Sequence, residues 1–224
     1  MKIALCIVYP LVGYPPFHQY ASRFVSSYQV CPPGHEHSTV IVCNGGPPDT
    51  FAQLVFGGMP GLQFLQHDNS GFDIGAFQMA ARTVPCDLMV FMGSSAWPTR
   101  PNWLARIADV TQRRGFGLYG AMGNSGDNMI NVSPHIRTTG FWIQPDLFNR
   151  YPFMVKEARF RYEFEHGNTC LTNWILKQGL QPWVVTWNGE WLRHQWRYVP
   201  NGFQNGDQSQ VIIRDRLTEP PFWA

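Results

Sequence analysis

The chain has 224 residues, of which 15% are aromatic and 14% are charged, and its formal net charge is +2. This length suits one large domain or two small ones, and the high aromatic content argues against a disordered chain. Because Lys and Arg form no run, the composition excludes a basic surface of the kind that binds nucleic acid. The sequence also lacks an apolar run of about 18 residues, so we expect no transmembrane helix.

The cysteines indicate where the protein is expected to reside. There are five, an odd number, and they are widely spaced without a Cys-x-x-Cys pair. This pattern favours free thiols in a reducing compartment, so we expect a cytoplasmic protein. The N-terminal stretch MKIALCIVYP lacks a small-residue cleavage site, and a first buried strand explains it better than a signal peptide does.

Apolar runs alternate with amphipathic stretches along the chain. Strands are predicted at 2–9, 39–46, 62–68, 87–92, 116–123, 135–143 and 181–187. Helices are predicted at 17–30, 72–84, 101–114, 145–151 and 168–179. The alternation predicts an α/β fold, a three-layer α/β/α sandwich with a mainly parallel central sheet. Residues 1–187 would form this domain, and residues 188–224 a C-terminal extension that packs on it as a flap or arm.

Ligands of parallel sheets bind beyond the carboxyl ends of the strands. Two loops at such ends have distinctive residues. In HDNSGFDIGAF, residues 67–77, Asn69 and Gly71 make a tight turn before a helix that starts near Asp73. Free N–H groups at a helix start attract an anion, although Asp73 could simply cap the helix. The strand 87–92 ends in Gly93, Ser94 and Ser95, where a metal-dependent enzyme would carry acidic residues.

Several stretches occur in an order that resembles a known class of enzymes. They are DNSGFDIGAFQMAAR, DLMVFMGSSAWPTRPNW, GLYGAMGN, PHIRTTGFWIQPDLF and FEHGNTCLTNWILKQGLQPWVV. The set resembles glycosyltransferases of the nucleotide-diphospho-sugar (GT-A) fold, family 2-like or of the rhamnan-synthesis type. The resemblance covers roughly residues 1–187. Gly93-Ser94-Ser95 would stand where those enzymes carry Asp-x-Asp, so that motif is degenerate here.

The resemblance implies a site and a reaction. The protein would move a sugar from a nucleotide-diphosphate donor to a saccharide or other hydroxyl acceptor, as in polysaccharide biosynthesis, by inversion. Glu165 would be the general base, with Glu163 as the alternative. The donor would bind to Tyr9, Asn44, Asp49, Asn69, Gly71, Asp73, Gly93, Ser94, Ser95 and His194. The acceptor would bind to Trp97, Thr138, Thr139 and Gly140.

The missing acidic motif leaves the role of a metal open. Serine is a poor ligand for Mg²⁺ or Mn²⁺, so either no metal is used or the donor diphosphate itself holds most of it. Backbone N–H groups, serine hydroxyls and a cation could then neutralise the leaving diphosphate. Arg137, Arg193 and His194 are the candidate cations.

Other functions compete with this interpretation. The chain could be a catalytically silent GT-A-like module for binding or assembly. It could also be a nucleotidyltransferase, but the stretch PLVGYPPFHQY lacks the Lys or Arg of a basic Gly-rich loop. A zinc site at Cys31, His35 and His37 lacks a second ligand pair. Ser94 or Ser95 as a hydrolase nucleophile lacks the Gly-x-Ser-x-Gly pattern.

Overall fold

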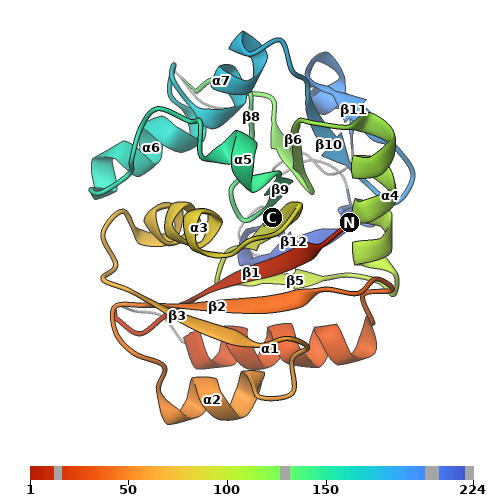
Figure 1. Ribbon diagram of the computed structural model, residues 1–224. Coiled ribbons are helices and arrows are strands. Elements are labelled where there is room, and N and C mark those ends of the chain that lie inside the picture. Colours follow the sequence, from red (N-terminus) through yellow and green to blue (C-terminus); the bar gives the residue numbers. More distant parts are fainter. Residues whose placement is uncertain (13–16, 127–131, 200–206, 220–224) are drawn as a thin grey trace.

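The computed structural model describes residues 1–12, 17–126, 132–199 and 207–219 of the chain. Within these residues, the main sheet has the spatial order β11-β10-β6-β9-β4-β1-β2-β3 (Figure 1). In that order the strands are Glu190–Leu192, Pro182–Val185, Leu118–Gly120, Gly140–Ile143, Leu88–Met92, Ile3–Pro10, Ser38–Asn44 and Gln63–His67. β1 pairs in parallel with β2 and β4, whereas β9 is antiparallel to both of its neighbours.

Helices cover both faces of this sheet (Figure 1). One face carries α1 (Phe17–Val30), α2 (Thr50–Phe56) and α4 (Trp103–Arg114). The other carries α3 (Phe72–Thr83), α5 (Pro145–Phe148), α6 (Ala158–His166) and α7 (Leu171–Lys177). Successive residues of β1 point to opposite faces, so Leu5 and Ile7 join the first core while Cys6 and Val8 join the second. The predicted three-layer α/β/α sandwich is therefore confirmed.

Two predicted strands are interrupted where the sheet reaches the candidate site. The predicted strand 135–143 divides into β8 (His135–Ile136) and β9, and the strand 116–123 divides into β6 and β7 (Gly123–Asn124). β7 and β8 pair with each other outside the main sheet. The residues between β8 and β9 are thereby released from the sheet at the edge where β4 ends, since Met92 pairs with Gly140.

Two helices of the structure, α2 and α6, were not predicted from the sequence. α2 is short, and it begins where the Asp49 side chain accepts a hydrogen bond from the backbone N–H of Ala52 at 2.7 Å. α6 has a polar sequence that buries only Phe164. In both cases the helical pattern of apolar residues is too brief to be recognised, and packing against neighbours supplies most of the stabilisation.

The predicted domain ends at residue 187, but later residues add strands and helical turns to the fold at two places. β11 and the 3₁₀ helix η1 (Arg193–Tyr198) follow β10 at the sheet edge. β12 (Ile213–Asp215) pairs antiparallel with β5 (Ala96–Pro98), and the 3₁₀ helix η2 (Arg216–Thr218) follows it. Of the helices that the structure describes, none has both the length and the apolar character needed to cross a bilayer.

Candidate active site

Glu165 of α6 is held at the gap between β8 and β9. Its Oε1 accepts hydrogen bonds from the Thr138 hydroxyl at 2.9 Å and from the Thr138 backbone N–H at 3.3 Å. Burial raises the pKa of Glu165, but Arg137, His135 and the bonds from Thr138 outweigh this effect and bring the pKa below its usual value. The carboxylate is therefore ionised at neutral pH and fixed in direction.

Ionisable groups on β8 and α3 interact with this carboxylate. His135 on β8 is buried, and burial lowers its pKa. Asp73 lies in the first turn of α3, where its charge interacts with that of Glu165. Burial raises the pKa of Asp73 to about 6, against the opposing effect of Arg161, whose Nη1 lies 3.9 Å from Asp73 Oδ1. Two carboxylates thus share one corner of the site with different proton affinities.

The turn before α3 has an unusual backbone. Asn69, Gly71 and Phe72 all have positive φ angles, of 70°, 70° and 56°. Gly71 is the N-cap of α3, so the alternative in which Asp73 caps this helix is wrong. A Cβ on Gly71 would overlap the carbonyl oxygen of Val155, which explains why only glycine fits there.

The turn at Gly93 is tied to the same gap in the sheet. The Gly93 N–H donates to the Thr139 carbonyl oxygen at 3.0 Å, and the Ala96 N–H closes the turn on the Gly93 carbonyl at 3.0 Å. Ser94 and Ser95 lie at the tip of this turn, half-buried. The Gly93 turn and the Glu165 carboxylate are therefore joined through the adjacent residues Thr138 and Thr139.

A buried ion pair between Arg137 and Asp215 lies beside these residues. Arg137 Nη2 lies 3.3 Å from Asp215 Oδ2, and the Asp215 side chain has no solvent exposure. Asp215 is the register partner of Ala96 in the β5–β12 pair. The positive charge of Arg137 also lowers the pKa of Glu165, whose partner Thr138 is the next residue in the chain. We name Asp73, His135, Arg137, Glu165 and Asp215 the carboxylate cluster.

Glu163 points elsewhere. Since α6 is helical, residues two positions apart face different directions. Glu163 accepts hydrogen bonds from the Thr169 N–H at 2.9 Å and from the Thr169 hydroxyl at 2.8 Å, and these bonds lower its pKa. Both of these bonds fix the turn between α6 and α7, and neither involves the carboxylate cluster.

A second group of predicted donor residues lies at the carboxyl ends of β1 and β2. The Tyr9 hydroxyl donates to Asp49 Oδ2 at 3.3 Å, and the Tyr9 ring stacks on Phe51 and on His18. Asn44, at the end of β2, hydrogen-bonds His67 Nδ1 at 2.7 Å. Because β1 lies between β2 and β4, this group and the Gly93 turn share one edge of the sheet.

Three predicted residues lie in other surroundings. Trp97 of β5 is buried beneath the Arg23 guanidinium, which lies 3.5 Å from the ring centroid. His194 is exposed on η1, which packs against β10, β11 and β7. Gly140 opens β9, where an added Cβ would approach Ile213 to 3.0 Å. The geometry links Trp97 to α1, and links Gly140 to the segment that carries Asp215.

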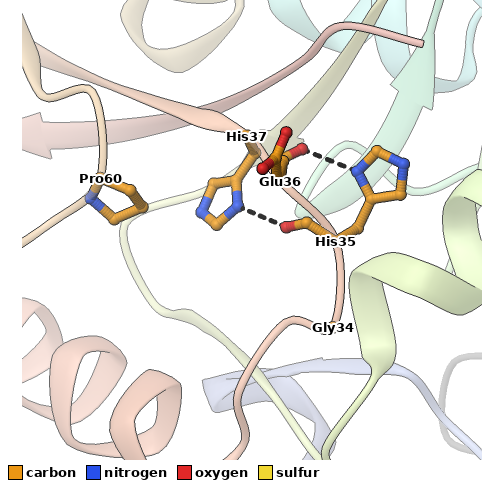
Figure 2. Close-up of a pocket in the computed structure, with 5 residues that line it drawn as sticks. All are labelled: Gly34, His35, Glu36, His37 and Pro60. Carbon is orange, nitrogen blue, oxygen red and sulfur yellow. Dashed lines mark hydrogen bonds between the residues drawn. The ribbon is translucent and has the colours of Figure 1, made fainter.

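His35 and His37, which the sequence offered as zinc ligands, line an open depression (Figure 2). It lies at the start of β2, at the end opposite to Asn44. It has a volume of about 670 Å³ and is lined by Gly34, His35, Glu36, His37 and Pro60. His37 Nδ1 donates to the His35 carbonyl at 3.0 Å, so its Nε2 accepts from the Tyr28 hydroxyl at 3.0 Å. With both ring nitrogens engaged, His37 has no lone pair for a metal. Over the described part of the chain, no three His, Cys, Asp or Glu side chains gather as a metal site.

The residues around the Gly93 turn do not fit a divalent cation. Ser94 and Ser95 offer hydroxyls in place of carboxylates, and the nearest buried carboxylate on the adjacent strand, Asp215, is paired with Arg137. This mismatch follows from the chemistry of the donor set, in which hydroxyls stand in place of carboxylates.

His135 and Asp215 were missed as site residues in the sequence. His135 is the first residue of a stretch that resembles an ordinary strand, and Asp215 stands in an irregular segment far along the chain. The one available signal was the stretch VIIRD, in which an acidic residue closely follows an apolar run and could share its burial, which is rare for acidic side chains.

Comparisons with known proteins reveal the fold. Neither a family model nor a curated protein matches the chain. Among solved structures, TarS from Staphylococcus aureus has a TM-score of 0.51 at 15% identity, over 72% of this chain and 32% of TarS. The mannosyltransferase PcManGT from Pyrobaculum calidifontis, in complex with GDP-Man and Mn²⁺, has a TM-score of 0.50 at 15% identity, over 66% of this chain and 46% of that one.

A third similar structure belongs to another class of enzyme. A protein from Bacillus anthracis assigned as a glucose-1-phosphate thymidylyltransferase has a TM-score of 0.51 at 16% identity, over 84% of this chain and 88% of that one. The chain therefore has the GT-A-like fold that glycosyltransferases and nucleotidyltransferases share. It spans about a third of TarS and about half of the mannosyltransferase. These identities are too low to transfer an activity.

Proposed function

We propose that this protein is a glycosyltransferase that moves a sugar from a nucleotide-diphosphate donor to a hydroxyl acceptor, with Glu165 as the general base. The observation that carries the proposal is the direction of Glu165, whose carboxylate is held by Thr138 beside the Gly93 turn. The fold supports it, because ligands of such sheets bind at the carboxyl edge where these residues lie.

The reaction is a single displacement at the anomeric carbon. The acceptor hydroxyl gives its proton to a Glu165 oxygen while its own oxygen forms the new bond to the anomeric carbon. The bond from that carbon to the diphosphate oxygen breaks, and its electron pair leaves with the nucleoside diphosphate. Attack and departure on opposite sides of the carbon invert its configuration.

The donor is assigned to the edge formed by β1, β2 and β4. The stacked rings of His18 and Phe51, which lie over the buried Tyr9, suit a nucleobase, because flat rings stack on one another. Backbone N–H groups and the hydroxyls of Ser94 and Ser95 would bind the diphosphate in the absence of acidic metal ligands. A metal, if bound, would be held mainly by the diphosphate oxygens. GDP-Man in the complex of the similar mannosyltransferase supports a nucleotide sugar as the donor class.

Nucleotidyl transfer is the second candidate, favoured by the coverage of 84% and 88% with the thymidylyltransferase structure. Such an enzyme takes a nucleoside triphosphate, which carries more negative charge than a nucleotide sugar. The stretch from Pro10 to Tyr20 contains no Lys or Arg to receive it. The carboxylate cluster is also better suited to taking a proton than to binding a triphosphate.

Ligand-induced changes in the melting temperature separate these functions. The panel consists of UDP-GlcNAc, UDP-glucose, GDP-mannose and dTDP-glucose, with dTTP and UTP as triphosphate controls. We expect at least one nucleotide sugar to raise the melting temperature, because a ligand that binds only the folded state stabilises it. Stabilisation by triphosphates alone would favour nucleotidyl transfer. No response to any nucleotide would leave only a silent module.

A further inference from the structure

Asp215 reaches the candidate site from a distant part of the chain. Its backbone pairs with Ala96 next to the Gly93 turn. Oδ1 accepts the backbone N–H of Leu217 at 2.9 Å, and the carbonyl oxygen accepts the Thr218 hydroxyl at 2.7 Å. Oδ2 remains directed at Arg137, at 3.3 Å. The turn formed by η2 therefore fixes this carboxylate in one orientation.

The burial of the Arg137–Asp215 ion pair indicates a role other than stabilising the fold. Asp215 is 0% exposed and Arg137 is 6% exposed. Removing two charges from water costs several kcal/mol per ion, and apolar residues of the same size are often as stable. The segment that carries Asp215 has other anchors, such as the Thr99 hydroxyl on the Val211 carbonyl at 2.6 Å. It does not depend on the ion pair to pack against β5.

Arg137 connects Asp215 to Glu165. Its planar guanidinium has five N–H donors and can face two carboxylates at once. The charge of Arg137 acts on Glu165, while Asp215 lies within ion-pair distance of the same guanidinium. Arg137 also directly precedes Thr138, whose hydroxyl and backbone N–H bind Glu165.

We propose that Asp215 is a positioning residue of the active site. It holds Arg137 in an ion pair, so that Asp215 and Glu165 share the positive charge of Arg137 and Glu165 stays able to accept a proton. The inference rests on the proposed role of Glu165 as the general base. It also makes segment 207–219 a part of the active site, rather than only a cover for the sheet.

Removal of the negative charge at position 215 should change the pKa of Glu165 in one definite direction. The full charge of Arg137 would then act on Glu165 and stabilise its ionised form, so the pKa of Glu165 would fall further. The other groups that face Glu165 remain unchanged in this variant. They are Asp73 from α3, His135 from β8 and His166 from α6.

The test measures the proton affinity of Glu165 directly, without need of a substrate. Protein labelled with ¹³C at the glutamate carboxyl groups is titrated by NMR, and the Glu165 signal is identified by its loss in Glu165→Gln. In Asp215→Asn, which keeps the side-chain volume and the acceptor for Leu217, the midpoint of Glu165 should move to lower pH. The matched control is Asp207→Asn, an exposed carboxylate of the same segment that accepts the Ser209 N–H at 2.9 Å. That variant should leave the midpoint unchanged.

An unchanged midpoint in Asp215→Asn overturns the inference, whether or not the protein transfers a sugar. If that variant does not fold, the double variant Arg137→Gln with Asp215→Asn removes both charges of the buried ion pair. In this variant the Glu165 midpoint should rise, since the positive charge that most lowers the pKa of Glu165 is lost, and an unchanged midpoint again contradicts the inference.

Turnover supplies a separate readout. With a donor that the wild type accepts, Asp215→Asn should lower kcat about tenfold with little change in KM, because a weaker base slows only the chemical step. The acid limb of the kcat profile should also move to lower pH. A wild type inactive with every donor would contradict the proposed function, while the NMR titration would still decide the role of Asp215.

Discussion

The backbone N–H of Gly93 donates to the carbonyl oxygen of Thr139 at 3.0 Å, and this bond joins the two halves of the candidate site. Gly93 begins the turn that follows β4, and Thr139 follows Thr138, the residue that binds Glu165. A donor diphosphate at the turn and an acceptor hydroxyl at the carboxylate would therefore lie side by side. The following predictions test parts of this arrangement.

The turn at Gly71 should tolerate no side chain. Gly71→Ala would place a methyl group on the Val155 carbonyl oxygen at a φ of 70°, so we expect a loss of about 2 kcal/mol or more in unfolding free energy. Urea denaturation measures this loss. The matched control is Gly58→Ala, where an added Cβ meets nothing within 4 Å and the change should stay within about 0.5 kcal/mol. Equal effects at the two positions would contradict the backbone argument.

Asp73 should make the stability of the protein depend on pH. Its pKa is raised to about 6 from 3.8, so the folded state holds the proton more tightly than the unfolded state does. This stabilisation is complete below about pH 3.8 and is lost as the pH rises through 6. Asp73→Asn, which cannot ionise, should therefore melt at a higher temperature than the wild type at pH 7.5, and the gain should fade towards pH 4.

Asp68 provides a control of opposite sign for this measurement. Hydrogen bonds from Ser70 hold the pKa of the Asp68 carboxyl below its usual value, so its ionised form favours the folded state. Asp68→Asn should lower the melting temperature at pH 7.5 and have no effect at a pH below both pKa values. A difference for Asp73→Asn that is constant from pH 4 to 7.5 would contradict the assignment of its pKa.

Nucleotide binding should not need a divalent cation. Because Ser94 and Ser95 supply no carboxylate and Asp215 is paired with Arg137, the protein contributes little to a metal site. The affinity for UDP, measured by isothermal titration calorimetry, should be the same within about twofold in EDTA and in Mn²⁺. A tenfold weaker affinity in EDTA would show that a metal bridges the protein and the diphosphate.

The sheet could be predicted because its strands are almost continuously apolar. β1 and β4 are buried on both faces, and a fully apolar run of that length suits little else. The interruption at Arg137–Thr139 could not be predicted, since β-branched threonines favour a strand. The residues leave the sheet only because Thr138 binds Glu165 and Thr139 binds Gly93, and these contacts join distant parts of the chain.

The sequence around Glu165 is itself misleading. Phe160, Tyr162 and Phe164 alternate with charged residues, which is a strand period, yet residues 158–166 form a helix. The packing of Phe164 favours the helix, because its ring packs edge-on against Phe148 and Tyr151 in the core. The helix then directs Glu165 to the site and Glu163 to Thr169, a distinction that no local pattern in the sequence contains.

The most direct test compares Glu165→Gln with Glu163→Gln in a donor-turnover assay. Nucleoside diphosphate release is measured with the nucleotide sugar that stabilises the wild type most, with and without added saccharide acceptors. We expect Glu165→Gln to bind this donor normally but to lose a factor of about 10² to 10⁴ in kcat. Glu163→Gln should retain most of the wild-type rate. Full turnover by Glu165→Gln would contradict the central claim that this carboxylate accepts the proton of the acceptor.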